Sequence, residues 1–489
     1  MLSPGIEEAK RLAQSHDVRR IPVSREIYSD VRTPIEVMRI LKGVSNHCYL
    51  LESVEPEEHF GRYTFLGFDP TMEITLRNGV LCIDKQEQRT DDPIGAIREV
   101  LAAHKALRNP ELPPFSGGLV GYFSYDFLKY AEPSLNLDAH DDEGFNDVDL
   151  MLFEKVIAFD NYRQKIVLID NVDTAAIDED YARAERELEK VSELIRTGAA
   201  MANTHGHCTS EFRQLFDEAG YCEIVERAKD HIREGDIFQV VLSNRLDADF
   251  EGSLLDTYRV LRAKNPSPYM FYFSSDAIEI AGASPETLVK LEDGILHTFP
   301  LAGTRPRGKT PAEDARLKEG LLADEKELAE HNMLVDLGRN DIGRVSKFNS
   351  VKVERYHQIL KFSHVMHIGS TVRGEIRDDC DALDAIASVL PAGTLSGAPK
   401  IRAAQIINDL EDCKRGIYGG AIGYIDLAGN MDTCIAIRLA FKKGGRVFVR
   451  SGAGIVADSV PENEHRECIN KAAAVVEALE LAESEGELA

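Results

Sequence analysis

Two segments far apart in the chain each carry a pair of glutamates spaced three residues apart. Glu327 and Glu330 lie in a stretch with helical periodicity, and Glu464 and Glu467 follow Pro461, a residue that suits the first turn of a helix. Because residues three apart share one face of a helix, each pair would present two carboxylates together. If the two faces converge, they could bind a hard divalent cation such as Mg²⁺. Taken alone, each pair is more simply a solvated acidic face.

One glycine-rich stretch matches a phosphate-binding pattern but lacks the backbone donors that such a site needs. Gly303–Thr310 fits G-x-x-x-x-G-K-[ST], the phosphate-loop pattern. However, Pro306 and Pro311 each remove an N–H group where the phosphate would be held. Thr310 and Glu313 instead predict a capping box at the start of a helix. We therefore expect no nucleotide at this stretch.

A second glycine stretch has a similar weakness. Gly452–Ala457 fits the dinucleotide pattern G-x-G-x-x-A, but Asp458–Pro461 separate it from the next predicted helix. No helix N-terminus would then lie on the glycines. We expect instead a backbone surface that lies close to a ligand.

The composition suits a globular protein that does not bind polyanions. The chain has 489 residues, enough for a large core, and its net charge of −26 opposes binding to nucleic acid or to an anionic membrane. No run approaches the ~18 apolar residues of a membrane helix, and residues 1–8 do not read as a signal peptide. Eight scattered cysteines without C-x-x-C fit reduced thiols, so we expect a cytoplasmic protein.

Alternating strand-like and helical segments indicate a mixed α and β protein in two parts. Residues 197–210 are small and polar and are the best candidate for a linker between residues 1–196 and residues 211–489. The histidines and the cysteine of this tract lack a second pair of ligands, so we expect no metal there. In the second part, helices are predicted near 212–234, 254–263, 311–322, 324–338, 382–389, 399–410 and 461–482.

Two strand-like segments share a glycine pattern. Gly117–Tyr122 and Gly419–Tyr424 both have glycines at the first, second and fifth positions. Glycines inside strands indicate bulges or close backbone approach. The echo suggests two related half-sheets.

Longer motifs follow one another in a fixed order and carry a family resemblance. The chain resembles the chorismate-utilising enzymes, and among them most closely the large subunits (component I) of anthranilate synthases. The resemblance covers nearly the whole chain and is far more specific than any single pattern. Its motifs are Asp236–Ser243, Gly282–Glu286, Pro300–Gly308, Asp324–Asp341, Val365–Ile368, Leu390–Lys400, Arg415–Gly420, Ile435–Arg438 and Gly452–Lys471.

The resemblance implies a fold and assigns different functions to different regions of the chain. The expected fold is α+β, with two intertwined subdomains whose large, mainly antiparallel sheets pack on each other and whose helices lie outside. Residues 1–196 would serve regulation and partner contacts, residues 197–210 would link the two parts, and residues 211–489 would bind chorismate and carry catalysis.

The resemblance also implies a substrate site that contains a metal. Glu327, Glu330, Glu464 and Glu467 would hold one Mg²⁺, which grips the ring carboxylate of chorismate. Arg438, whose planar guanidinium suits a carboxylate, would bind the enolpyruvyl carboxylate. The other substrate-binding residues that the resemblance implies are Gly303, Thr304, Tyr418, Ala453, Gly454 and Lys471.

The implied reaction assigns roles to three further residues. Ammonia would add at ring carbon C2, the 4-hydroxyl would leave, and elimination of pyruvate would give anthranilate, the first committed step of tryptophan biosynthesis. Glu286 would be the general acid, which requires a raised pKa. His367 would assist the elimination, and Thr394 and Thr304 would form hydrogen-bonding walls. Without its motif, His367 would as readily be a core histidine.

Two positions discriminate among members of the family. Gln239 stands where isochorismate-forming relatives carry a lysine that activates water, and a glutamine cannot do this. Ala302 stands where aminodeoxychorismate synthases tend to carry a lysine, and the small alanine leaves C2 open to ammonia. Both residues favour an ammonia nucleophile and anthranilate as product.

The resemblance implies a partner and an inhibitor. The chain has no Gly-x-Cys-x-Gly-His nucleophile motif, so a separate glutamine amidotransferase subunit (component II) would supply ammonia, although the chain alone could use free ammonium. Tryptophan would bind as a feedback inhibitor where Leu50–Ser53 and Asn265–Met270 meet. The tryptophan-binding residues would be Glu52, Ser53, Pro268, Tyr269 and Met270, with Glu52 paired to the ligand ammonium.

Other functions remain open at this point. The chain could be a sister enzyme that stops at aminodeoxyisochorismate or makes 4-amino-4-deoxychorismate. It could be a catalytically inactive subunit that senses tryptophan, although its glutamates are intact. A phosphate-loop nucleotide enzyme is the third alternative, and ATP binding would reveal it.

Overall fold

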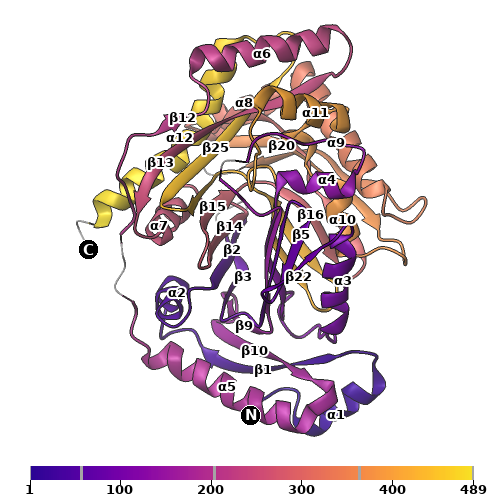
Figure 1. The fold of residues 1–489 in the computed structure, drawn as a ribbon, viewed down its shortest axis with the longest axis vertical. Coiled ribbons are helices and arrows are strands. Elements are labelled where there is room, and N and C mark those ends of the chain that lie inside the picture. The colour runs from indigo at the N-terminus through magenta and orange to yellow at the C-terminus, as the bar shows by residue number, and fades with distance from the viewer. Residues whose placement is uncertain (1, 56–58, 142, 202–204, 362–364, 487–489) are drawn as a thin grey trace.

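Two large sheets pack face to face, and helices cover the outer face of each (Figure 1). This computed structural model describes residues 2–55, 59–141, 143–201, 205–361 and 365–486. Within those residues the first sheet has 13 strands and the second has 12, and all the pairs between named strands are antiparallel. The α+β fold with packed antiparallel sheets is therefore confirmed.

The first sheet runs in spatial order through β1 (Arg20–Tyr28), β10 (Lys165–Asp173), β9 (Lys155–Asp160), β3 (His59–Phe68), β2 (Cys48–Glu55), β14 (Tyr269–Ser274), β15 (Glu279–Ser284), β24 (Leu439–Lys443), β25 (Arg446–Ile455), β13 (Gln239–Glu251) and β11 (His207–Cys208), with β12 (Arg213–Gln214) and β21 (Gly397–Ala398) also on β13. The second runs through β18 (Leu301–Pro306), β20 (Val365–Glu375), β17 (Ile295–Thr298), β16 (Thr287–Glu292), β23 (Met431–Ile435), β22 (Ala421–Asp426), β7 (Gly118–Phe123), β8 (Val148–Phe153), β4 (Met72–Arg77), β5 (Val80–Ile83) and β6 (Gln86–Arg89), with β19 (Lys352–Lys361) on β20.

Both sheets combine strands from the two ends of the chain. In the first sheet β2 pairs with β14, and in the second β7 pairs with β22. The segments 1–196 and 211–489 therefore share both sheets, and the proposed boundary between them follows the chain rather than the layers. Of the predicted linker, residues 202–204 lie outside the described residues, and His207–Cys208 pair with β13.

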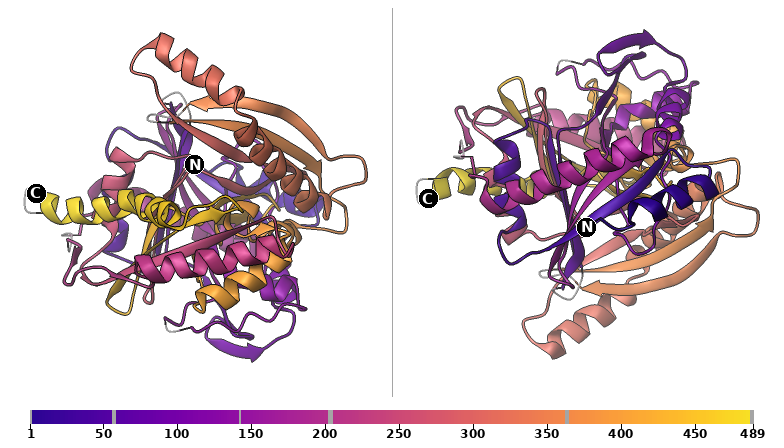
Figure 2. Two further views of the ribbon diagram at one scale, coloured as in Figure 1. Left: turned by 90° about the horizontal axis from the view of Figure 1, so that it is seen from above. Right: turned by 90° about the horizontal axis from the view of Figure 1, so that it is seen from below.

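The helices pack their apolar residues against the outer faces of the two sheets. Helices α1 (Ile6–Ser15), α2 (Pro34–Lys42), α5 (Ile177–Thr197), α7 (Leu255–Lys264) and α12 (Pro461–Gly486) contribute to the core outside the first sheet. Helices α3 (Pro93–Ala103), α9 (Glu325–Gly343) and α10 (Ala382–Val389) do so for the second. The remaining helices are α4 (Leu128–Ala131), α6 (Glu218–Arg233), α8 (Pro311–Leu322) and α11 (Lys400–Glu411), with 3₁₀ turns at Tyr125–Phe127, Thr174–Ala176 and Gly393–Leu395. Figure 2 shows α12, in yellow, running outward from the middle of the molecule.

The helices predicted within residues 211–489 are present, and the largest shift of a boundary is at the start of the first of them. The helix expected near 212–234 begins only at Glu218, because Arg213–Gln214 pair with β13 and Asp217 caps the helix by accepting from the Gly220 N–H at 2.8 Å.

The phosphate-loop match is not a nucleotide cradle: β18 ends at Pro306, and the Thr310 hydroxyl caps α8 by accepting from the Glu313 N–H at 3.2 Å.

The two glycine-patterned segments are neighbouring strands. In the pairing of β7 with β22, Gly121 lies directly opposite Gly423. Their φ angles are +153° and +157°, and a Cβ atom on Gly121 would lie 2.0 Å from the Asp149 carbonyl oxygen. Any side chain here would therefore push the strands apart.

A buried ion cluster joins the first sheet to the segment that carries Thr394. Glu411 accepts hydrogen bonds from Arg415 and, at 2.9 Å, from Arg450, and its carboxylate also receives the Ser243 N–H at 2.7 Å. Arg415 donates in turn to the carbonyl oxygens of Leu395 and Val241, at 2.6 Å each. Burial alone would raise the pKa of Glu411, but the two guanidinium charges hold this pKa below its ordinary value.

Within the described residues no helix is long and apolar enough to cross a membrane, and all eight cysteines are free thiols.

We predict that Glu411→Gln destabilises the protein by about 3–5 kcal/mol, because it leaves two buried guanidinium groups short of a counter-charge. Urea unfolding at neutral pH measures this loss. Because the folded-state pKa of Glu411 is depressed, the advantage of the wild type should shrink as the pH falls below the ordinary glutamate pKa. As a matched control, Glu193→Gln breaks an exposed pair with Arg196 and should cost less than about 1 kcal/mol. Equal unfolding midpoints for the two variants would contradict the prediction.

Candidate active site

The two acidic helices meet, although they come from different layers. Helix α9 packs on β18 and β20 of the second sheet, whereas α12 packs on β25 of the first. Partial loss of hydration and the charges of Glu327 and Glu467 raise the pKa of Glu330. Burial and the charge of Glu467 likewise raise the pKa of Glu464, while Lys326 on α9 opposes this. Carboxylates of the two helices therefore lie within electrostatic reach of each other.

Each acidic helix is supplied with one cation from the chain. Arg305 of β18 donates to Glu327 at 3.1 Å and to Asp324, the N-cap residue of α9, at 2.8 Å. On α12, the ammonium of Lys471 lies 2.7 Å from the Glu467 carboxylate. The negative charges of the pair on each helix are thus partly balanced. Arg305 lies within Pro300–Gly308, but nothing in the sequence pattern marks it as a residue that pairs with the glutamates.

Strands β18 and β20 place a histidine beside a glycine turn of the backbone. His367 Nδ1 lies 3.0 Å from the Gly303 carbonyl oxygen and 3.1 Å from Thr304 Oγ1. Since a carbonyl oxygen only accepts, Nδ1 carries the proton, and Nε2 is the acceptor nitrogen of the neutral ring. Burial lowers the pKa of His367, and the positive charge of Arg438 lowers it further. Gly303 has φ +66°, and a Cβ atom on it would lie 3.0 Å from Glu327 Oε2, so the backbone here closely approaches the predicted metal ligands.

Arg438 is held in an unusual backbone conformation next to α12. Its φ is +55°, which is rare for a residue with a long side chain and costs free energy that the surrounding structure must offset. The carbonyl oxygen of Arg438 accepts from the Ala283 N–H at 3.0 Å, and its guanidinium donates to the carbonyl oxygen of Lys471. Burial lowers the pKa of Arg438, whereas Glu467 favours its charged form. A positive guanidinium is thus poised beside the acidic helices.

The end of β25 contributes backbone rather than side chains. Lys471 donates to the Gly452 carbonyl oxygen at 3.0 Å, and a Cβ atom on Gly452 would lie 2.9 Å from the Tyr418 hydroxyl. A Cβ atom on Gly454 would lie 2.8 Å from Gln239 Nε2. Ala453 is fully buried in a core cluster, so only its backbone can face a substrate. The side chains of Tyr418 and Gln239 thus closely approach the backbone of the glycine stretch, and no helix begins directly on it; that a ligand lies against this backbone stays a prediction.

Glu286 has the electrostatics of a general acid at neutral pH. It lies between β15 and β16, and its carboxylate accepts from the Thr394 hydroxyl at 3.2 Å. Burial raises the pKa of Glu286 to about 7, although Thr394 and the charge of Lys471 oppose the rise. Lys471 therefore links Glu286 electrostatically to the glutamates of both helices.

The residues predicted to bind tryptophan gather on β2 and β14, but they face two sides. Glu52 lies opposite Met270 in the strand register, and its carboxylate is engaged by Arg262 at 2.5 Å and by the Tyr258 hydroxyl. A ligand ammonium would therefore share Glu52 with a guanidinium. Ser53 is half-buried next to Gly61 of β3, and Pro268 directly precedes β14.

Tyr269 points away from Glu52 toward the second sheet. Its hydroxyl donates to Asp432 of β23 at 2.7 Å and lies 2.9 Å from the hydroxyl of Thr287, the residue that follows Glu286. Neighbouring strand residues alternate between faces, so Tyr269 and Met270 cannot line the same face of β14. The residues predicted to bind tryptophan therefore lie on both faces of the first sheet: Glu52 faces helix α7, and Tyr269 faces the second sheet.

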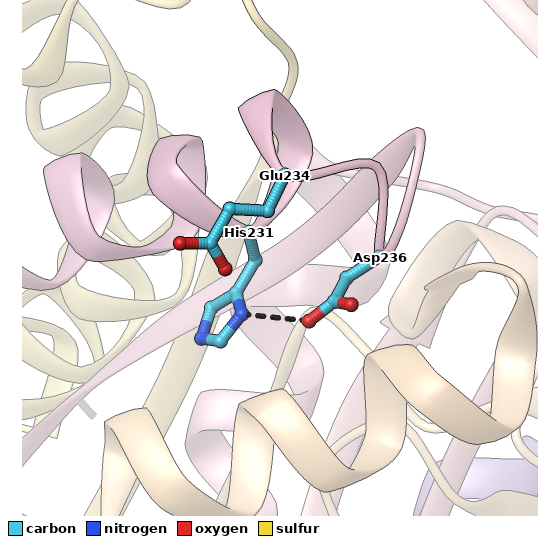
Figure 3. Close-up of side chains that lie close together, drawn as sticks. All are labelled: His231, Glu234 and Asp236. Carbon is cyan, nitrogen blue, oxygen red and sulfur yellow. Dashed lines mark hydrogen bonds and ion pairs between the residues drawn. The ribbon is translucent and has the colours of Figure 1, made fainter.

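A second cluster of possible ligands lies apart from these residues, at the end of α6 (Figure 3). His231 Nδ1 lies 3.0 Å from Asp236, and Glu234 lies close by. The same oxygen of Asp236 also accepts from Arg402 at 2.5 Å. The charge of Asp236 is already matched, so this cluster is an ion-pair network of the surface.

Comparison with known proteins places this geometry in a family. Residues 46–477 match the model of the chorismate binding enzyme family. The anthranilate synthase component 1 proteins of Acetivibrio thermocellus and Aquifex aeolicus are 43% and 44% identical to the chain, with 99% of both chains covered in each case. The solved structure of anthranilate synthase component I from Streptococcus pneumoniae superposes with a TM-score of 0.78 at 39% identity, over 92% of this chain and 99% of that one.

A more distant structure shares the fold alone. The menaquinone-specific isochorismate synthase of Escherichia coli superposes with a TM-score of 0.70 at 20% identity, over 97% of this chain and 98% of that one. The family match and the full-length identities are much stronger than this likeness. The chain belongs to the chorismate-binding enzymes, in the group of anthranilate synthase component 1 proteins.

Proposed function

We propose that the protein converts chorismate and ammonia to anthranilate and pyruvate in a Mg²⁺-dependent reaction. The observation that carries this proposal is the half-buried Glu286, poised to titrate near neutral pH next to two converging acidic helices. Its relatives are named for anthranilate synthesis, and Gln239 and Ala302 favour ammonia over water as nucleophile at C2.

The residues present fit the cation that the family implies. Glu327, Glu330, Glu464 and Glu467 offer oxygen ligands only, and burial, together with the nearby charge of Glu467, raises the pKa values of Glu330 and Glu464. When bound, Mg²⁺ would neutralise these carboxylates and attract the ring carboxylate of chorismate. In the substrate complex, Arg438 orients the enolpyruvyl carboxylate, while Tyr418 and the backbone at Gly454 enclose it.

The chain's own residues then handle the protons. Glu286, held by Thr394, donates its proton to the 4-hydroxyl, which leaves as water while ammonia forms the bond to C2 and both ring double bonds shift. Neutral His367, fixed by Gly303 and Thr304, lies near Arg438, where Nε2 can take a proton as pyruvate is eliminated. Both roles require the protonation states that burial of these groups favours.

Ammonia would come from a glutamine amidotransferase partner. The chain has no glutaminase nucleophile motif, and the name "component 1" of its relatives implies a second component for those proteins. Tryptophan would inhibit by binding at β2 and β14, where Tyr269 connects this site to Thr287 and so to Glu286. Such coupling between sites is typically worth about 1–3 kcal/mol.

We expect the purified chain to form anthranilate and pyruvate from chorismate, Mg²⁺ and ammonium, but not from glutamine, because it has no glutaminase of its own. Fluorescence and mass spectrometry of the product measure this, and EDTA should abolish it. Accumulation of aminodeoxyisochorismate or 4-amino-4-deoxychorismate would instead identify a sister enzyme, and no turnover at all would favour a sensing subunit.

Glu286→Gln should lower kcat by about 10²–10⁴-fold while Mg²⁺-dependent chorismate binding persists, since the amide fills the same space but cannot protonate the leaving group. In the wild type, kcat/KM should fall as the pH rises through about 7, because the acid must be protonated. Stopped assays across pH and equilibrium binding measure the two effects. A variant with wild-type turnover would dismiss Glu286 as the acid.

Ser53→Phe should raise the tryptophan concentration for half inhibition at least tenfold without changing kcat, because the ring would occupy space between β2 and β3 where the ligand must fit. Inhibition curves at fixed chorismate test this, with Ser53→Ala as a control that adds no bulk. If the curve for Ser53→Phe overlays the wild type, Ser53 does not belong to the tryptophan pocket.

A further inference from the structure

A cavity of about 50 Å³ adjoins Glu286 on the side of α9. Its walls come from β16, β17, the 3₁₀ turn at Gly393–Leu395 and α9. Most of the wall is apolar, but five residues with polar side chains line it: Glu286, Thr287, Thr298, Asp341 and Thr394. Two of these, Glu286 and Thr394, are the hydrogen-bonded pair of the proposed acid.

Thr298 brings an unsatisfied hydroxyl to this cavity. The residue is only 7% exposed, and its Oγ1 has no hydrogen-bond partner among the described residues. A Cβ atom on Gly338 would lie 3.0 Å from this Oγ1, so the hydroxyl faces a glycine that also lines the cavity. A buried hydroxyl without a partner is costly, and water is the usual partner in such a place.

The opposite wall ends in a charged pair. Asp341 lies 2.9 Å from the ammonium of Lys400, which also donates to the Val389 carbonyl oxygen at 2.9 Å. A cavity needs roughly 10–15 Å³ to hold a water molecule, and that molecule needs two to four polar partners. The cavity exceeds that volume several times, and its polar groups can serve more than one water.

We propose that this cavity is a water chamber that serves Glu286: it receives the water released from C4 and returns a proton to the Glu286 carboxylate after each turnover, with Thr298 as the fixed hydroxyl of the chain. Thr298 is thus a positioning residue for the waters and does not touch the substrate. This inference rests on the proposed function, because it takes Glu286 as the acid.

The protons balance over one cycle. Glu286 gives its proton to the 4-hydroxyl, the C4–O bond breaks with its electron pair on oxygen, and water forms. The nitrogen that has bonded to C2 loses one proton to solvent. A chamber water donates a proton to the Glu286 carboxylate and is itself reprotonated through its neighbours from solvent, so the enzyme returns to its starting state without any further reactant.

Thr298→Val tests the role of the hydroxyl, since valine keeps the shape of threonine and removes the polar group. With the full chain, chorismate, Mg²⁺ and saturating ammonium, we expect kcat to fall five- to tenfold, KM for chorismate to stay within twofold, and the solvent deuterium isotope effect on kcat to rise. Thr298→Ser retains the hydroxyl and should restore kcat and the isotope effect to within twofold of the wild type.

Gly338→Ala tests the space independently, because it adds one methyl group next to Thr298 Oγ1 within α9, where alanine favours the helix. We expect the same slower kcat and larger isotope effect, with an unfolding midpoint not below that of the wild type. A fall in kcat with an unchanged isotope effect in both variants would overturn the chamber, as would wild-type kinetics in both.

Further outcomes distinguish failure of the water chamber from failure of the acid role of Glu286. A rise in KM for ammonium at unchanged kcat would show that the cavity holds the nucleophile and would overturn the proposal. If Glu286→Gln is inactive while Thr298→Val and Gly338→Ala behave as wild type, only the water chamber fails. If Glu286→Gln keeps wild-type turnover, the proposed acid role fails and the chamber fails with it.

Discussion

The site depends on holding like charges together. Glu327 and Glu330 belong to a helix of the second sheet, and Glu464 and Glu467 to a helix of the first, so the distance between the pairs is set by how the two sheets pack. Aromatic and aliphatic side chains from both sheets fill one continuous core between them. That apolar packing opposes the mutual repulsion of the carboxylates, which would otherwise move the helices apart.

Basic side chains balance the negative charge of the buried and half-buried glutamates, both at the site and in the core of the first sheet. Arg305 and Lys471 each pair with one acidic helix where the site is open. Deeper in the first sheet, Arg415 and Arg450 surround the buried Glu411, and Arg415 also holds the carbonyl oxygen of Leu395. Because Leu395 follows Thr394, the partner of Glu286, the buried cluster fixes the backbone that supports the proposed acid.

Motif order along the sequence predicted the family, and with it the α+β fold. Helical periodicity located both acidic helices, and Thr310 was correctly predicted as a cap rather than a phosphate ligand. The pairing of β7 with β22 could not be derived, because a glycine echo indicates similarity and not contact. The left-handed backbone of Arg438 could not be predicted either, since it arises from long-range packing.

The interleaving of the strands has a consequence for how the protein is made. Strand β2 leaves the ribosome more than 200 residues ahead of its partner β14, and β7 about 300 residues ahead of β22. Until then both strands have an unfilled edge, which is a surface that invites mispairing with other nascent chains. We therefore expect the amino-terminal half to need chaperones during synthesis, and a gene split within residues 197–210 would yield two pieces that each lack strands of both sheets.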